Sequence, residues 1–362
     1  MGLDPKLEQS EQTILGRWWQ KEKEAFRCMV CPRYCLIKPG KRGFCYVRAA
    51  GDDGIYLTTY GRSSGFCIDP IEKKPLNHFY PGTPVLTFGT AGCNLGCKFC
   101  QNWDISKARS WDRLGSAASP EKIATLAKSH GCHSIAFSYN DPVIFAEYAI
   151  DCAKSAHQHG LYTVAVSAGY MGEEARTDFY QHIDAVNIDL KSFSESFYKR
   201  LCLGHLQPVL DTLVYLVQKT QVWVEITTLI IPEENDSPEE IRALCEWIIT
   251  NLGPDIPLHF TAFHPDYKMV KTRQTSAWAL QTARQYAIDA GLNYVYIGNV
   301  HDSNGSSTYC PQCKQKVIER DWYMLGPSGL HINKCSQCGE TIKGHFTENL
   351  GNWGAKRKQI SV

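Results

Sequence analysis

Three cysteines within eight residues are the part of this sequence best suited to chemistry. Cys93, Cys97 and Cys100 stand at C-x3-C-x2-C spacing in CNLGCKFC, and Gln101-Asn102-Trp103 follows. Three thiolates suit a cubane [4Fe–4S] cluster, in which each iron takes one ligand. Because the chain supplies only three ligands locally, one iron stays open to bind another molecule. The spacing therefore predicts a reactive cluster, with a zinc knuckle or incidental thiols as the alternative.

Four cysteines near the N-terminus form a complete thiolate set. Such a set accepts zinc as well as an iron–sulfur cluster, and spacing does not decide between the two. The loop that contains Pro39, Gly40 and Gly43 resembles a zinc or rubredoxin-like knuckle, which slightly favours a structural site. The alternatives are a second cluster, which would relay electrons or anchor substrate, and thiols that bind nothing. The four residues are Cys28, Cys31, Cys35 and Cys45.

Two C-x2-C knuckles near the C-terminus, separated by 21 residues, have the spacing of a zinc ribbon. Residues 317–320 and 330–332 between them could form its strands. A structural or protein-binding role is expected, since the nearby lysines make only a modest basic face for nucleic acid. The four ligands would be Cys310, Cys313, Cys335 and Cys338.

The composition agrees with a metal-binding protein of the cytoplasm. Eleven of the 16 cysteines fall into these three groups, and no secretion signal is apparent, so metals are expected rather than disulfides. Lys and Arg number 38 against 37 Asp and Glu, a net charge of +1, which does not point to nucleic acid or a membrane surface. We also find no apolar stretch long enough to span a bilayer.

The middle of the chain must position the first cysteine group, and there short β-branched or apolar runs alternate with helical patterns. Six such βα units predict a partial (β/α)6 barrel of the TIM type, whose function gathers at the carboxyl ends of the strands. The predicted strands are 85–90, 134–138, 162–167, 185–190, 222–231 and 258–263. The predicted helices are 120–129, 143–158, 208–218, 238–250 and 275–289.

The reactive cysteines follow the first predicted strand directly, and polar residues follow or end the other strands. Carboxylates and amides there can hold an ammonium group and ribose hydroxyls, and Lys191 can hold a carboxylate. The alternatives are structural: Asp141 could open a helix, and Asp189 could pair with Lys191. The candidate residues are Asn140, Asp141, Ser167, Asp189, Lys191, Glu225, Thr227 and His264.

We expect three parts in the chain. Residues 1–82 combine an amphipathic helix over residues 7–26 with the N-terminal four-cysteine segment. Residues 83–300 form the barrel, and residues 301–362 form the zinc ribbon and a tail.

Several longer segments make the sequence resemble one family. The chain resembles radical S-adenosylmethionine (SAM) enzymes of the AmmeMemoRadiSam system, which are related to the pyruvate formate-lyase activating enzymes. The resemblance covers residues from about 26 to 313, and Asp141 stands where that family more usually has Glu. The segments are FRCMVCPRYC, KRGFC, TFGTAGCNLGCKFCQNWDIS, SYNDPVIFAEYA, AVNIDLKSFSESFYKRLCLGHLQPVLDTL, TTLIIPEENDSPEEI, HFTAFHPDYKM, YVYIGNV and TYCPQC.

The resemblance implies a cofactor pair and the residues that hold it. Cys93, Cys97 and Cys100 would ligate a [4Fe–4S] cluster whose open iron chelates the methionyl amine and carboxylate of SAM. One electron from the cluster would split SAM to a 5′-deoxyadenosyl radical, which abstracts hydrogen from a substrate. The resemblance places Asn140 and Asp141 at the SAM amine and His264 over the adenosyl group. It places Ser167, Asp189 and Lys191 near the ribose and the carboxylate.

The resemblance also implies partners. An electron donor of the flavodoxin or ferredoxin type would reduce the cluster, and Memo-type and AMME-type proteins would associate with the enzyme. One alternative is a glycyl-radical enzyme activase, whose substrate is a glycine of a partner protein. Another alternative is a metal-binding interaction module without turnover. The polar residues at successive strand ends argue against the module.

Overall fold

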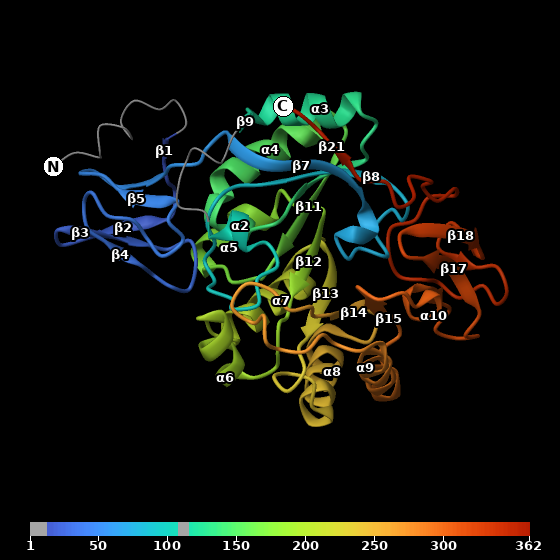
Figure 1. Cartoon of the computed structure of the whole chain (residues 1–362). Helices are drawn as coiled ribbons and strands as arrows, with labels where there is room; N and C mark the ends of the chain where they lie inside the picture. The colour runs from blue at the N-terminus through green and yellow to red at the C-terminus, as the bar shows by residue number, and fades with distance from the viewer. Residues whose placement is uncertain (1–12, 108–115) are drawn as a thin grey trace.

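One twisted sheet with helices on its outside forms the centre of the computed structural model, which describes residues 13–107 and 116–362 (Figure 1). Its strand order is β15-β14-β13-β12-β11-β10-β8-β7-β21, with β9 (Ser116–Ala117) paired to β7. The strands from β8 to β15 in this order are all parallel. They are β8 (Pro84–Gly89), β10 (Ser134–Phe137), β11 (Tyr162–Ser167), β12 (Ala185–Asp189), β13 (Trp223–Ile230), β14 (Leu258–Ala262) and β15 (Val295–Gly298).

The open strand order confirms the partial barrel and each of its six predicted strands. A seventh parallel strand, β15, was not predicted. β7 (Arg62–Pro70) was also missed because Ser and Gly interrupt it; it pairs antiparallel to β8. β21 (Lys358–Gln359) pairs with β7 in turn. The sheet therefore extends beyond both limits expected for the barrel segment.

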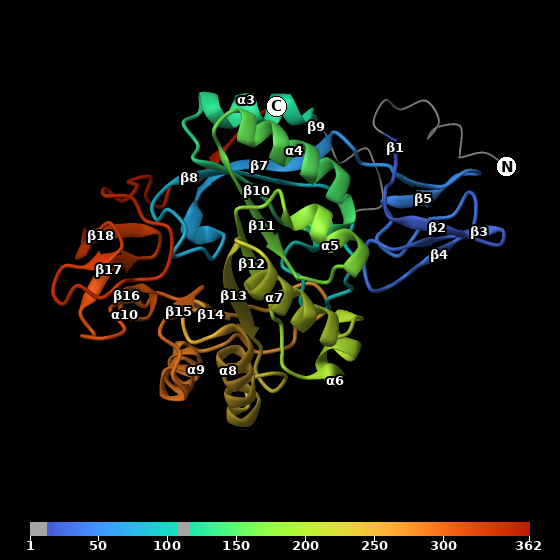
Figure 2. The ribbon, with the colours of Figure 1, turned by 180° about the vertical axis from the view of Figure 1, so that it is seen from behind.

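Helices cover the outer face of the sheet, as the view from behind shows (Figure 2). Ser119 and Ser237 cap two of them, accepting hydrogen bonds from Lys122 N and Glu240 N at 3.2 Å each, and a proline opens the first turn in both. α5 was not predicted. The main helices are α3 (Pro120–Ser129), α4 (Ala146–Gln158), α5 (Glu173–Tyr180), α7 (Gln207–Lys219), α8 (Pro238–Leu252) and α9 (Ala277–Ala290).

Short helices complete the connections between these elements. Some precede or follow the strand ends, and others lie at the entry to the C-terminal part. They are η1 (Ile71–Lys73), α2 (Trp103–Ser106), η3 (Pro142–Phe145), α6 (Glu195–Phe197), the π-helix η4 (Tyr198–Cys202) and α10 (Ser303–Ser306).

The N-terminal segment forms small antiparallel sheets, and the predicted helix over residues 7–26 is wrong from residue 14 onward; residues 7–12 lie outside the described part. Trp19 packs edge-on against Phe26 at 5.3 Å between ring centroids, a cross-strand contact that the helical reading of the same apolar spacing cannot supply. Lys23 takes a φ of 56° in the tight turn between them. The strands are β1 (Ile14–Leu15), β2 (Trp19–Glu22), β3 (Ala25–Cys28), β4 (Leu36–Ile37), β5 (Arg48–Ala50) and β6 (Ile55–Leu57).

The C-terminal part is a small β-structure that packs against the last strand of the barrel. Tyr294 and Tyr296 share a hydrophobic cluster with Cys310 and Ile318. The predicted strands at 317–320 and 330–332 fall within or overlap observed ones. The strands are β16 (Thr308–Tyr309), β17 (Lys316–Asp321), β18 (Met324–Ser328), β19 (Leu330–His331) and β20 (Lys334–Cys335).

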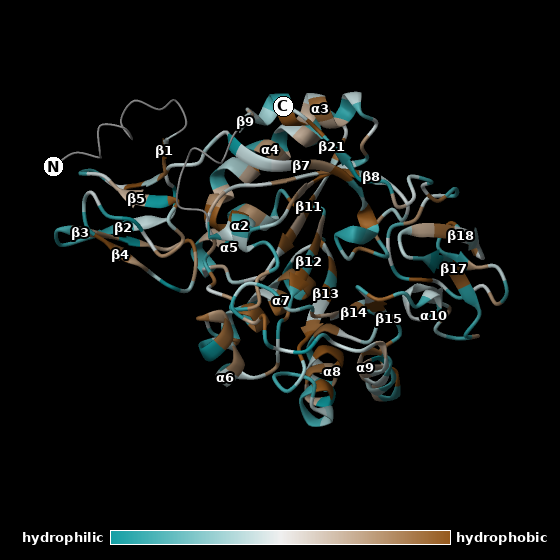
Figure 3. Cartoon of the chain, viewed as in Figure 1, coloured by the Kyte–Doolittle hydropathy of each residue, from teal (hydrophilic) through white to brown (hydrophobic). Residues whose placement is uncertain are grey.

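Hydrophobic residues concentrate in the central strands, whereas β2 and β17 carry many hydrophilic ones (Figure 3). β8, β10, β12 and β14 each bury nearly every residue, as expected for parallel strands covered on both faces. Polar side chains inside this sheet therefore need partners or a ligand.

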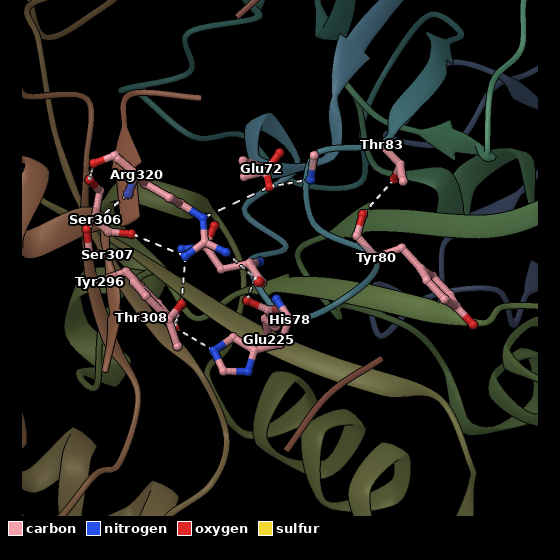
Figure 4. A network of polar contacts seen from close by, with 12 residues as sticks. Glu72, His78, Tyr80, Thr83, Glu225, Tyr296, Ser306, Ser307, Thr308 and Arg320 are labelled. Atoms are coloured by element: carbon pink, nitrogen blue, oxygen red, sulfur yellow. Dashed lines mark hydrogen bonds and ion pairs between the residues drawn. The ribbon is translucent and has the colours of Figure 1, made fainter. Parts of the chain in front are cut away.

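A buried polar network closes the amino ends of the barrel (Figure 4). The Glu225 carboxylate accepts hydrogen bonds from Asn77 N (2.9 Å), His78 N (2.8 Å), Trp223 Nε1 (3.0 Å) and His259 Nε2 (2.6 Å). Residues 71–83 connect Pro70 to Pro84, so this contact lies where β8 begins. The prediction that Glu225 belongs to the strand-end site is wrong, because its oxygens bind the connection at the opposite end.

Candidate functional site

The three-cysteine loop leaves the carboxyl end of β8 and is held by its backbone. Gly96 N donates to Cys202 O at 2.8 Å, and Lys98 N donates to Leu201 O at 2.9 Å, so η4 fixes the middle of the loop. Gly92 has a φ of 81°, and a Cβ on it would lie 2.1 Å from Cys45 O. No other residue fits there without displacing backbone.

Asn140 clamps the start of this loop. Its Oδ1 accepts from Thr90 N at 3.0 Å, and its Nδ2 donates to Thr90 Oγ1 (3.1 Å), Ala91 O (3.3 Å) and Gly92 O (3.0 Å). Both polar atoms of the Asn140 side chain form hydrogen bonds with residues 90–92, so Asn140 positions the start of the loop.

Asp141 binds the next strand end. It accepts hydrogen bonds from Val143 N (3.1 Å), Ser167 Oγ (2.9 Å) and Ala168 N (3.1 Å), which joins β10 to β11 and caps η3. Burial raises the pKa of Asp141 to about 6, although these hydrogen bonds oppose the shift. The structure thus brings Asn140, Asp141 and Ser167 together with the cysteine loop.

The thiols of the loop differ in their electrostatics. A hydrogen bond from Cys202 lowers the pKa of Cys97 to about 7, with the charges of Lys191 and Lys107 acting in the same direction against burial. Burial raises the pKa of Cys93 to about 12. The contact with Cys202 was missed because that residue stands alone in the sequence, 105 positions after Cys97 by the numbering.

Asp189 and Lys191 face each other beside these thiols. Lys191 Nζ lies 2.9 Å from Asp189 Oδ2, and the Lys191 side chain is 14% exposed. Burial acts to lower the pKa of Lys191, yet the charges of Asp189 and Cys97 outweigh it and hold the pKa well above its usual value. The pairing considered as an alternative is thus present, and it lies next to the Cys97 thiol. His264 differs, since it is exposed on the loop after β14.

The surroundings of the loop fit a cluster with a polar ligand beside it. Within the described part of the chain, Thr227 Oγ1 and Gln101 Nε2 are buried without a hydrogen-bond partner. Thr227 pairs in register with Asp189, and Gln101 directly follows Cys100. A cluster held by Cys93, Cys97 and Cys100 would have one iron without a protein ligand, and Thr227 and Gln101 carry buried polar groups that a bound ligand could satisfy.

The four C-terminal cysteines form a site for a single ion. Their sulfurs all lie within 4.8 Å of one another, with Cys310 to Cys338 at 3.6 Å and Cys313 to Cys335 at 3.7 Å. A tetrahedral ion with metal–sulfur bonds of about 2.3 Å requires sulfurs about 3.8 Å apart. The predicted ribbon therefore has the geometry of a four-thiolate metal site.

The segment that contains the three-cysteine loop and most of the barrel is similar to known proteins. The sequence profile of the Radical SAM superfamily matches residues 88–248. An uncharacterized protein of Methanocaldococcus jannaschii is 39% identical over 320 residues, which cover 87% of this chain and 94% of the relative. The pyruvate formate-lyase-activating enzyme of Clostridium pasteurianum is 28% identical over 176 residues, 48% of this chain and 71% of that enzyme.

Among solved structures, a domain of a pyruvate-formate lyase-activating enzyme from Bacteroides vulgatus superposes with a TM-score of 0.41 at 19% identity. The superposition covers 46% of this chain and 99% of that domain.

In the described residues, every helix is too short or too polar to cross a membrane.

Proposed function

This chain belongs to the radical SAM superfamily and is an enzyme of that superfamily, and we propose that Cys93, Cys97 and Cys100 hold its [4Fe–4S] cluster. The single observation that carries the proposal is the three-thiol loop at the carboxyl end of β8, held by Asn140 and η4. In this family, the cluster supplies one electron that cleaves SAM reductively to a 5′-deoxyadenosyl radical.

The residues around the loop then have separate tasks. Asn140 keeps the loop in place and Asp141 keeps the end of β11 in place, so that the three thiols would hold the cluster at the carboxyl end of β8. Lys191 would bind the carboxylate of SAM, and Asp189 and Thr227 would bind its hydroxyl groups. The buried surroundings exclude water and other hydrogen donors from the reacting atoms.

The radical would abstract hydrogen from a substrate bound at the same end of the barrel. We propose the AmmeMemoRadiSam system as the specific group, with Memo-type and AMME-type proteins as partners and a flavodoxin or ferredoxin as electron donor. The resemblance of long segments of the sequence to that group supports this proposal.

A second candidate is a glycyl-radical enzyme activase. The similarity to the pyruvate formate-lyase-activating enzyme of Clostridium pasteurianum favours it. Its substrate would be a glycine on a partner protein, so hydrogen abstraction would depend on that partner while SAM binding would use the same residues.

The experiment that tests the proposed function is anaerobic reconstitution with iron and sulfide, followed by dithionite and SAM. We expect 5′-deoxyadenosine and methionine in samples that contain both reagents, and neither product when dithionite is omitted. A metal-binding module without turnover gives no 5′-deoxyadenosine in any sample, which would contradict the proposal.

Changing Lys191 to Ala tests the SAM site. We expect the affinity for SAM to fall by about 1.5–3 kcal/mol, the scale of a lost hydrogen bond to a charged group. Titration of SAM into the reconstituted variant measures this change, and iron content should match that of the parent. Unchanged affinity together with a lower melting temperature would assign Lys191 to the Asp189 ion pair alone.

Zinc is our proposal for the C-terminal cysteines. Metal analysis of the purified protein should find about one zinc per chain, and Cys335→Ala/Cys338→Ala should release it. Cys132→Ala/Cys245→Ala is the matched control, because it removes two buried thiols that stand outside the three cysteine groups. Zinc that persists in the Cys335/Cys338 variant would place the ion elsewhere.

A further inference from the structure

The four N-terminal cysteines converge on one buried place. Cys28 ends β3, and its N–H donates to Cys35 O at 2.9 Å, so these two stand across the turn that contains Cys31. A Cβ on Gly43 would lie 3.8 Å from Cys35 Cβ, and the turn that begins at Gly43, closed by Tyr46 N donating to Gly43 O at 3.0 Å, contains Cys45. Cys28, Cys31 and Cys45 are at most 9% exposed, and Cys35 is partly buried.

The spacing of these sulfurs differs from that of the ribbon. All cysteines of the three groups lie in the described part of the chain, and there only the C-terminal set has three or more sulfurs within 4.8 Å of one another. The N-terminal set is therefore wider than a single tetrahedral ion requires, about 3.8 Å between sulfurs. In this respect it matches the loop of Cys93, Cys97 and Cys100, which also falls outside that limit.

The distance between the sulfurs distinguishes a single-ion site from an iron–sulfur cluster site. Four thiolates around a single ion touch one another, whereas in an iron–sulfur cluster each thiolate binds its own iron and bridging sulfides separate the irons. The described residues thus contain one compact four-thiol site and one four-thiol group whose sulfurs lie farther apart. The slight preference for a zinc-type knuckle in the N-terminal segment does not agree with this difference.

The N-terminal site lies against the reactive loop. Gly92, the residue before Cys93, packs directly against the N-terminal site, because a Cβ on Gly92 would lie 2.1 Å from Cys45 O. Arg33, between Cys31 and Cys35, donates to Asn94 O and Leu203 O. Cys45 and Cys93 also line one pocket together. The two thiol groups are therefore neighbours although they are far apart in the sequence.

We propose that Cys28, Cys31, Cys35 and Cys45 hold a second iron–sulfur cluster beside the reactive loop. With four thiolates its irons are all ligated, so it offers no open position for SAM or substrate. This inference concerns a separate site and stands independently of the proposed function.

The test removes the reactive loop's ligands and leaves the N-terminal site intact. We expect Cys93→Ser/Cys97→Ser/Cys100→Ser, reconstituted anaerobically with iron and sulfide, to retain about two to four iron and as many sulfide per chain. Dithionite should bleach the visible absorbance of this cluster. Adding Cys28→Ser/Cys31→Ser should remove the remaining iron, while adding Cys335→Ser/Cys338→Ser instead should leave it in place.

Two results would overturn the inference. Loop-variant protein without iron and with about two zinc would show that both remaining four-thiol sites hold zinc. Loop-variant protein without iron and with about one zinc would show that the N-terminal thiols hold no metal. Neither measurement uses SAM, so either result would leave the proposed function standing. Failure of the proposed function would instead appear as an absence of 5′-deoxyadenosine in the separate SAM cleavage experiment.

Discussion

Replacing Cys97 by Ala should abolish 5′-deoxyadenosine formation. The loop supplies three thiolates, and loss of one leaves two irons without a protein ligand, so the site-differentiated cluster is not formed. Cys97 is the buried member of the set and the one whose pKa lies lowest, at about 7, through its hydrogen bond from Cys202. The product is measured by chromatography after anaerobic reconstitution with dithionite and SAM.

Cys245→Ala is the matched control for this variant. Cys245 is a fully buried thiol on α8, and its removal deletes the same atom without touching the loop. We expect the control to produce 5′-deoxyadenosine at the parent's level. Equal production by the Cys97 variant and the parent would contradict the assignment of the loop as the cluster site.

Replacing Arg48 by Met should destabilise the protein by about 3–5 kcal/mol, the cost of breaking a buried ion pair. Arg48 in β5 binds Glu147 in α4 through two hydrogen bonds, Nη1 to Oε1 at 2.7 Å and Nη2 to Oε2 at 2.5 Å. Both side chains are at most 2% exposed. The variant leaves the Glu147 charge buried without its partner, and chemical denaturation measures the loss.

Two further variants separate this effect from general loss of packing. Arg48→Met/Glu147→Leu should recover most of the lost stability, because no uncompensated charge remains. Arg273→Met removes an exposed pair with Glu233, 3.6 Å apart, and should cost less than about 1 kcal/mol. A double variant as unstable as Arg48→Met would contradict the ion-pair explanation.

The same pair predicts a dependence on pH. Burial acts to raise the pKa of Glu147, but the Arg48 charge and its hydrogen bonds outweigh it and hold the pKa below its usual value. A carboxylate with a lowered pKa in the folded state stabilises the protein above its unfolded pKa, and the contribution is lost as the pH falls through the folded pKa. Arg48→Met/Glu147→Leu should therefore lose less stability than the parent between about pH 5 and pH 3.

Local pattern was sufficient for most of the fold. The runs that became β8, β10, β11, β12, β13 and β14 are apolar and bounded by helical patterns, and each was predicted. β7 was not predicted, because Ser and Gly interrupt its apolar pattern; only its antiparallel pairing with β8 identifies it as a strand. The N-terminal helix failed because the apolar residues at positions 14, 15, 18 and 26 fit short strands and a hairpin as well as they fit a helix.

The candidate site also has parts that the local sequence predicts and parts that depend on the tertiary fold. Clustered cysteines are visible in the sequence because their ligand spacing is local, and the ribbon's four sulfurs meet as expected. Cys202 and Arg33 reach the loop through the tertiary fold, so no spacing announces them. Glu225 was misplaced because it lies near the start of β13, and its partners Asn77 and His78 belong to the connection at the amino end of the barrel.

The most direct test of the central claim is electron–nuclear double resonance of the reduced protein with SAM labelled by ¹⁵N at the methionyl amine. We expect a hyperfine coupling between the label and the cluster in the parent protein, because the iron that Cys93, Cys97 and Cys100 leave open would bind that amine. Cys97→Ala should show no coupling. A parent sample with an intact reduced cluster and bound SAM but without the coupling would contradict the account.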